Sequence, residues 1–298
     1  MSALGSRLLD SVVTTGNYLE LQERLDALDS ELDELRRRDD AWTLSFQQLD
    51  QQLRLASQVQ RDLLPQRPPE IRAGRIHTLF HPAEHVSGDI YNLARLDEST
   101  VCLALADATG HGIAAALLTV FIKQGLRGKE TYDGCYRILS PADVLERLNV
   151  DLLETNLSDG QFVTAVYAVF DEQERTLTWG RAGAPHPILV RRGAEPRLLS
   201  SAGTLLGAVA NSKYETASMV MRPGDTVLLY TDGLEALLVP KQSRHHPRGL
   251  QGTPWFAELG ERPIEKSLDE IRTRLTTLDP HDWPVDDVTV VALSMTQP

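Results

Sequence analysis

The sequence predicts a long N-terminal helix followed by an α+β domain of antiparallel sheets and helices. The first segment, residues 18–64, contains no Gly or Pro and places leucines at heptad spacing. Beyond Pro65, short apolar or alternating runs are bounded by Gly, Pro and Asp, as is typical of strands joined by turns. Helical patterns are grouped apart from these runs, which favours a layered α+β architecture.

The N-terminal segment has the repeat of a coiled coil. An alternating spacing of four and three residues runs through Leu21, Leu25, Leu28, Leu32, Leu35, Trp42, Phe46, Leu49, Leu53, Ala56 and Leu63. Polar Asp39 and Gln60 occupy two positions of the same seam. This pattern predicts a homodimer through residues 18–63. The alternative is a long amphipathic helix packed on its own domain.

Prolines 65, 68 and 69 should end this helix, because proline cannot continue the hydrogen-bond ladder. We therefore place an N-terminal helix at 1–64 and a second domain at 65–298. The strands expected there are Arg75–His81, Val101–Asp107, Phe162–Phe170, Thr176–Arg181, Ile188–Val190, Thr226–Tyr230 and Val288–Leu293. The expected helices are Ile113–Leu126, Pro141–Thr155 and Ile264–Leu278, and the first should be buried because it is apolar almost all round.

Composition excludes several classes of partner. The net charge is −12 and no long basic cluster is present, which argues against nucleic acid and against an anionic membrane surface. No stretch approaches the roughly 18 apolar residues that span a bilayer. The first ten residues lack the apolar core of a signal peptide. We expect a cytoplasmic protein.

Four aspartates stand at the ends of apolar strands or in turns beside glycine: Asp89, Asp107, Asp232 and Asp286. One such Asp is more often a turn former or helix cap. Four of them, each tied to a strand end, indicate a shared site. Carboxylates without nearby Cys or paired His ligands favour Mg²⁺ or Mn²⁺ over Zn²⁺.

The order and spacing of several motifs resembles the SpoIIE/RsbU-like branch of the metal-dependent (PPM-type) serine/threonine protein phosphatases. The resemblance runs from about Gln60 to Leu293. Its motifs are Gln60–Pro65, His81–Ala83, Val86–Tyr91, Asp107–Gly112, Ala182–Pro187, Leu205–Gly207, Pro223–Asp225, Tyr230–Gly233 and Asp286–Thr289.

The resemblance implies two antiparallel sheets sandwiched between helices and a site for two Mn²⁺ or Mg²⁺ ions. It implies metal ligation by Asp89, Asp107, Asp232, Asp286 and the Ala108 carbonyl. Asp107 would bridge the ions, and Asp107 and Asp232 would be the catalytic residues. A metal-bridging hydroxide would then attack the phosphorus of phosphoserine or phosphothreonine. Asp287 is the alternative to Asp286 as the last ligand.

The implied substrate is a phosphorylated STAS-domain protein of the anti-anti-sigma type, in signal transduction by partner switching. A catalytically silent phosphatase-like module, acting through its coiled coil, is the main alternative. A two-metal phosphohydrolase acting on small molecules is another. His111 would act either as a proton donor or as a turn residue between two glycines.

Overall fold

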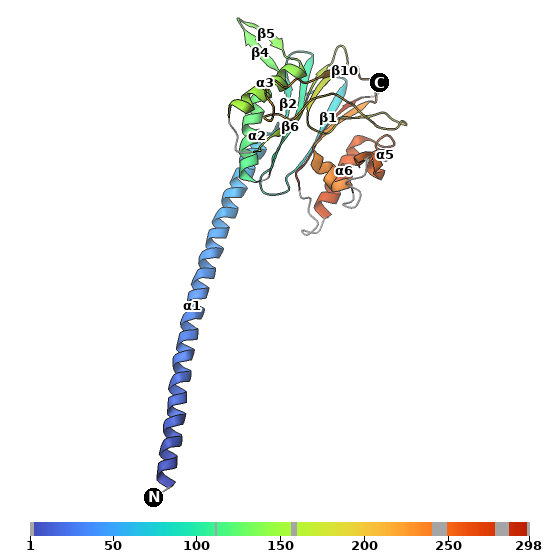
Figure 1. Ribbon diagram of the computed structural model, residues 1–298. Helices are drawn as coiled ribbons and strands as arrows, with labels where there is room; N and C mark the ends of the chain where they lie inside the picture. The colour runs from blue at the N-terminus through green and yellow to red at the C-terminus, as the bar shows by residue number, and fades with distance from the viewer. Residues whose placement is uncertain (1–2, 111, 156–159, 240–248, 278–285, 297–298) are drawn as a thin grey trace. The chain divides into compact units, whose positions relative to one another are not determined.

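The computed structural model describes residues 3–110, 112–155, 160–239, 249–277 and 286–296, with side chains from residue 23 onward (Figure 1). The chain divides into two compact units, Met1–Leu55 and Ala56–Pro298, and each is described by itself. No helix within the described ranges is both long enough and apolar enough to cross a membrane.

Helix α1 runs from Ala3 to Leu63, so the expected N-terminal helix is confirmed. Among its described side chains in the first unit, Leu25, Leu28, Leu32 and Leu35 are each about half exposed, at 48–55%. These exposures are those of a single chain, and the coiled coil remains a prediction.

The last two turns of α1 belong to the second unit. Here the buried side chains are Ser57 and Gln60, followed by Leu64 just beyond the helix. Gln60 was expected as a polar position of the inter-chain seam, but its side chain bonds to Ser87 and Thr119 within its own unit. Beside Gln60, the buried residues are thus Ser57 and Leu64, each one position after the predicted seam residues Ala56 and Leu63.

The second unit holds twelve strands and five α-helices after α1 in its described residues. The strands are β1 (Gly74–His81), β2 (Asp89–Arg95), β3 (Thr100–Ala108), β4 (Lys129–Tyr132), β5 (Cys135–Ile138), β6 (Val163–Asp171), β7 (Thr176–Ala182), β8 (Ile188–Val190), β9 (Arg197–Leu198), β10 (Thr216–Val220), β11 (Thr226–Tyr230) and β12 (Val288–Met295). The helices are α2 (Ile113–Gly125), α3 (Pro141–Glu154), α4 (Asp232–Leu238), α5 (Pro254–Glu258) and α6 (Ile264–Thr277), with a 3₁₀ turn η2 (Gly249–Gly252).

Two five-stranded sheets form the centre of this unit. Sheet A has the order β1-β12-β11-β8-β9 and sheet B has the order β10-β7-β6-β3-β2. All strand pairs in both sheets are antiparallel. Strands β4 and β5 form a separate hairpin. The prediction of two antiparallel sheets is confirmed.

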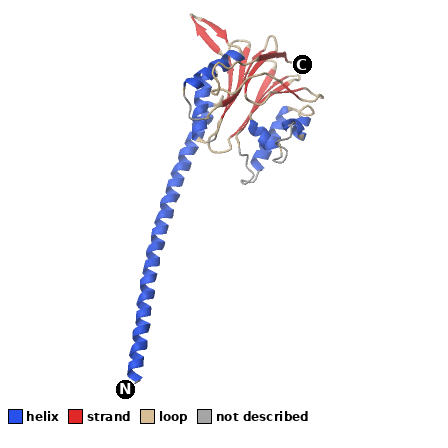
Figure 2. Cartoon of the chain, in the orientation of Figure 1, coloured by secondary structure: helices blue, strands red, loops and turns tan. Residues whose placement is uncertain are grey.

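Helices cover the outer faces of both sheets (Figures 1 and 2). Helices α2 and α3 contact sheet B, while α4 and α6 contact sheet A. Strand β12 shows how the layers form, because its side chains alternate between two cores. Val291 and Leu293 join the core shared with sheet B, whereas Val290 and Ala292 join the core beneath α4, α5 and α6.

Two expectations need correction. Helix α2 is only half buried: Ala115, Leu118 and Ile122 face the core, whereas Ile113 and Leu117 are exposed at 52% and 67%. The expected strands also omitted β2, the hairpin, β9 and β10. Strand β2 is buried on both faces at its centre, so it lacks the alternation that marks a half-exposed strand.

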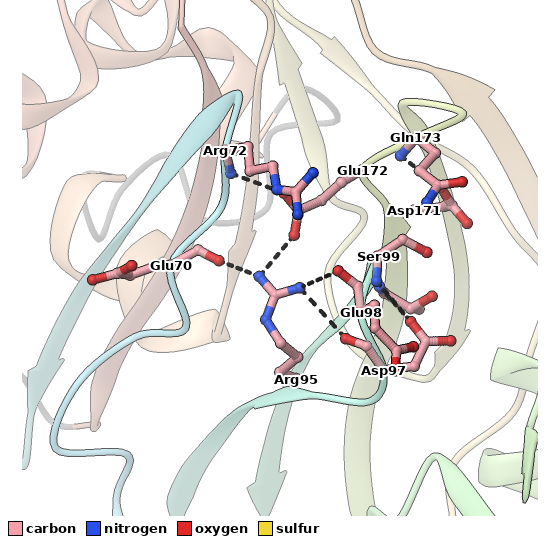
Figure 3. Close-up of polar contacts among 10 residues, drawn as sticks. Glu70, Arg72, Arg95, Asp97, Glu98, Ser99, Asp171, Glu172 and Gln173 are labelled. Atoms are coloured by element: carbon pink, nitrogen blue, oxygen red, sulfur yellow. Dashed lines mark hydrogen bonds and ion pairs between the residues drawn. The ribbon is translucent and has the colours of Figure 1, made fainter.

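Arg95 on β2 of sheet B binds the linker between α1 and β1, residues 64–73 (Figure 3). The Arg95 guanidinium pairs with Glu172 at 2.7 Å and donates to the Glu70 carbonyl. Glu172 also accepts the Arg72 amide at 2.8 Å, and its side chain is only 7% exposed. A buried carboxylate that holds a guanidinium and an amide fixes the linker firmly.

Candidate active site

Asp89 and Asp107 are direct register partners on β2 and β3 of sheet B. Residues opposite one another in an antiparallel pair project from the same face, with their Cβ atoms about 5 Å apart. Two carboxylates in this arrangement repel each other, and Asp89 is in addition almost fully buried. The sequence, which only placed them at strand ends, did not predict this pairing.

Asp232 and Asp286 belong to the segments around sheet A. Asp232 is the first residue of α4 and is separated from β11 by Thr231, and Asp286 precedes β12 by two residues. Repulsion from the carboxylates of Asp232, Asp286 and Asp287 contributes to the raised pKa of Asp107. These three carboxylates therefore lie near that of Asp107. All four predicted aspartates therefore lie at the same end of the paired sheets.

Charge and burial shift the acidity of these groups. The pKa of Asp89 is raised well above its usual range, first by burial and then by Asp107 and Asp287. Burial, followed by repulsion from Asp232, Asp286 and Asp287, raises the pKa of Asp107 to about 7. Loss of solvation also raises the pKa of Asp232. Burial is the largest cause for all three groups, and repulsion between carboxylates adds to it for Asp89 and Asp107.

Two glycines allow the backbone to pack closely at this site. A Cβ on Gly88 would lie 2.8 Å from the Ala108 carbonyl oxygen. A Cβ on Gly233 would lie 1.9 Å from the Asp287 carbonyl oxygen. The amide of Ala108 also donates to the Gly88 carbonyl at 2.9 Å. Glycine is thus required beside Asp89 and Asp232 for steric reasons.

Several contacts around the site were not predicted from the sequence. Asp287 accepts two backbone amides, and the hydroxyls of Thr231 and Thr289 donate to Asp89. Gln60 bonds to Ser87, two residues before Asp89. Both threonines are part of motifs quoted above, but a motif does not say what its side chains contact. His111 lies outside the described residues.

The donor set fits hard divalent cations, although it does not enclose one. Within the described residues, no group of three or more Asp, Glu, His or Cys side chains is close enough to hold a metal ion as it stands. Every candidate ligand supplies oxygen, however, and the pKa values of Asp89 and Asp107 are raised first by burial and then by repulsion from neighbouring carboxylates. Mg²⁺ and Mn²⁺ prefer such ligands and would neutralise that charge.

Comparisons with known proteins agree with this architecture. The family described as "Stage II sporulation protein E (SpoIIE)" matches residues 97–296. Phosphoserine phosphatase RsbU of Bacillus subtilis is 28% identical over 189 residues, which are 63% of this chain and 54% of that protein. The chain thus spans about half the length of this curated relative.

Two solved structures share the fold. The SiaA-PP2C domain of Pseudomonas aeruginosa has a TM-score of 0.67 at 21% identity, covering 84% of this chain and 98% of that one. RsbX in complex with magnesium has a TM-score of 0.55 at 18% identity, covering 77% and 99%. By its sequence match and its fold, the chain belongs to the SpoIIE family, in the RsbU-like branch of the PPM-type protein phosphatases.

Proposed function

We propose that this chain is a metal-dependent protein serine/threonine phosphatase. The observation that carries the proposal is the pairing of Asp89 with Asp107 across β2 and β3, beside Asp232 and Asp286, in a chain of the SpoIIE family. Burial and mutual repulsion make it costly to keep these carboxylates together. Clusters of acidic groups with shifted pKa values are found mainly at functional sites.

These residues would hold two Mn²⁺ or Mg²⁺ ions, with the Ala108 carbonyl as a further ligand. When bound there, such ions supply a water molecule of lowered pKa and positive charge for the phosphoryl oxygens. The chain's own part is to present oxygen ligands from both sheets. Asp107, whose pKa is about 7 in the protein without metal, must lose its proton before it can bind a cation.

The proposed substrate is a phosphoserine or phosphothreonine on a protein, of the STAS-domain anti-anti-sigma type. Its support is the similarity to RsbU, which is described as a phosphoserine phosphatase. The test is to incubate the full-length protein and Mn²⁺ with phosphorylated STAS proteins from the same genome and to measure released phosphate. Faster release from a nucleotide than from every phosphoprotein would instead indicate a small-molecule phosphohydrolase.

We further propose that the chain is a homodimer through residues 18–63. The support is the row of half-exposed leucines at Leu25, Leu28, Leu32 and Leu35. Leucines at heptad spacing on one helix bury this surface when a second helix packs alongside.

A further inference from the structure

Two hydroxyl groups from sheet A hold the carboxylate of Asp89, which lies on sheet B. Thr231, the residue after β11, donates to Asp89 Oδ2 at 2.8 Å. Thr289 on β12 donates to the same oxygen at 2.5 Å. Both threonines are buried, at 3% and 0% exposure. These bonds cross the interface between the sheets and end on one of the two carboxylate oxygens.

The two threonines also fix each other. The Thr289 amide donates to the Thr231 hydroxyl oxygen at 3.0 Å, and the Thr231 amide donates to the Thr289 carbonyl at 3.1 Å. A hydroxyl has one proton to donate. The Asp89 Oδ2 atom, at 2.8 Å, is nearer to the Thr231 hydroxyl than its other two acceptors, the carbonyls of Asp287 at 3.4 Å and Thr289 at 3.5 Å, so the proton is assigned to Asp89. In the described part of the chain, the hydrogen bonds to the Asp89 carboxylate end on Oδ2. Oδ1 is therefore the oxygen that can face a cation.

Asp287 holds the backbone that leads to Asp89. Its Oδ1 accepts the Ala83 amide and its Oδ2 accepts the Gly88 amide, each at 2.7 Å. The side chain is buried and so fixes both ends of the segment 83–88. Charged acceptors make strong bonds to backbone amides. Both oxygens of Asp287 are thus engaged in shaping the loop, and the Asp286 carboxylate in turn accepts the Asp287 amide at 2.9 Å.

We propose that Thr231, Thr289 and Asp287 are positioning residues that set the orientation of Asp89 before a cation binds. The two hydroxyls select which Asp89 oxygen faces the cation, and Asp287 holds the loop in front of it. With both Asp287 oxygens accepting backbone amides, Asp286 is the expected ligand of this pair, as the family resemblance also implies. This inference rests on the proposed phosphatase function, since it assumes a cation beside Asp89.

The first test is a calorimetric titration with MnCl₂ of full-length wild type, Thr289→Val, Thr289→Ser and Thr231→Val. Outer partners of a metal ligand usually contribute about 10–100-fold to metal affinity. Each valine variant should therefore bind Mn²⁺ about 10–100-fold more weakly with an unchanged number of ions. Thr289→Ser keeps the hydroxyl and should bind like wild type. Wild-type affinity in both folded valine variants would overturn the proposal, as would a serine variant as weak as the valine one.

The second test compares adjacent carboxylates in Asp287→Asn and Asp286→Asn. With chelator present, Asp287→Asn should lower the melting temperature, because an amide nitrogen would face a backbone N–H. It should still bind the wild-type number of Mn²⁺ ions, more weakly. Asp286→Asn should melt no lower than wild type and should lose an ion. The opposite pattern would assign the ligand role to Asp287. If wild type bound no Mn²⁺, the phosphatase proposal itself would fail, and the positioning role with it.

Discussion

The Gln60 side chain forms hydrogen bonds with both the carbonyl and the amide of Ser87. Its Nε2 donates to the Ser87 carbonyl at 2.6 Å, and the Ser87 amide donates to its Oε1 at 2.9 Å. The Ser87 hydroxyl in turn accepts the Asp89 amide at 3.0 Å. A continuous set of hydrogen bonds therefore joins the end of α1 to the first aspartate of the site.

Replacing Gln60 with leucine should destabilise the second unit. Gln60→Leu leaves two buried backbone groups of Ser87 without their partner, which costs about 1–3 kcal/mol for each group. Asp39→Leu is the control, because Asp39 is a polar seam position on an exposed stretch of the same helix. Urea unfolding followed by circular dichroism should show a lower midpoint for Gln60→Leu alone. Equal midpoints for the two variants would contradict the role assigned to Gln60.

Coupling between α1 and the site is a further hypothesis, with a typical magnitude of about 1–3 kcal/mol. Its readout is Mn²⁺ affinity and turnover in the same two variants. If α1 has no influence on the site, Mn²⁺ affinity and turnover will match wild type in Gln60→Leu as well as in Asp39→Leu.

The oligomeric state tests the predicted coiled coil. Leu28 and Leu32 lie on the seam, whereas Leu44 is equally exposed but off it, at 58%. The double variant Leu28→Asp/Leu32→Asp should be monomeric, because two charges would be buried in the helix interface. Leu44→Asp should remain a dimer. Sedimentation at micromolar concentration measures both, and a monomeric wild type would show that the seam does not pair two chains.

The sequence predicted the parts of the fold that repeat locally. Strands β8 and β11 were placed at their observed bounds because each is a short apolar run, β8 between Pro187 and Arg191 and β11 between Asp225 and Thr231. The four aspartates were found because they stand at the ends of apolar strands or in turns beside glycine. The heptad pattern located the helix, but it could not show that Gln60 turns inward.

Contacts between distant residues could not be predicted in this way. Thr231 lies 142 positions from Asp89 and Thr289 lies 200 positions away, so no local pattern joins them. The pairing of Asp89 with Asp107 depends on strand register, which the burial of whole faces determines. The sequence thus indicated the candidate site residues, while their supporting contacts required the three-dimensional structure.

Metal binding should depend on pH because of Asp107. Its pKa of about 7 means that a proton competes with the cation in acidic buffer. Mn²⁺ affinity should therefore be about tenfold weaker at pH 6 than at pH 8. Calorimetry in two buffers of different ionisation enthalpy would also detect the released proton. An affinity that did not change between these pH values would contradict the assignment of Asp107 as a ligand.

The same carboxyl has an opposite effect on the stability of the metal-free protein. Its folded pKa of about 7 exceeds the reference value of 3.8, so the folded state holds more protons between these two values. Stability should consequently fall as pH rises from about 4 to about 7. Asp107→Asn should flatten that dependence, as measured by thermal unfolding in chelator across the range.

The most direct test of the central claim is phosphate release from a phosphoserine STAS protein by full-length chain. Wild type with Mn²⁺ should turn over repeatedly, and excess chelator should abolish release. Asp107→Asn should lose at least about 100-fold in turnover, because it removes the charge expected to bridge two cations. Rapid release by Asp107→Asn, or by wild type in chelator, would contradict a metal-dependent phosphatase site built on Asp89 and Asp107.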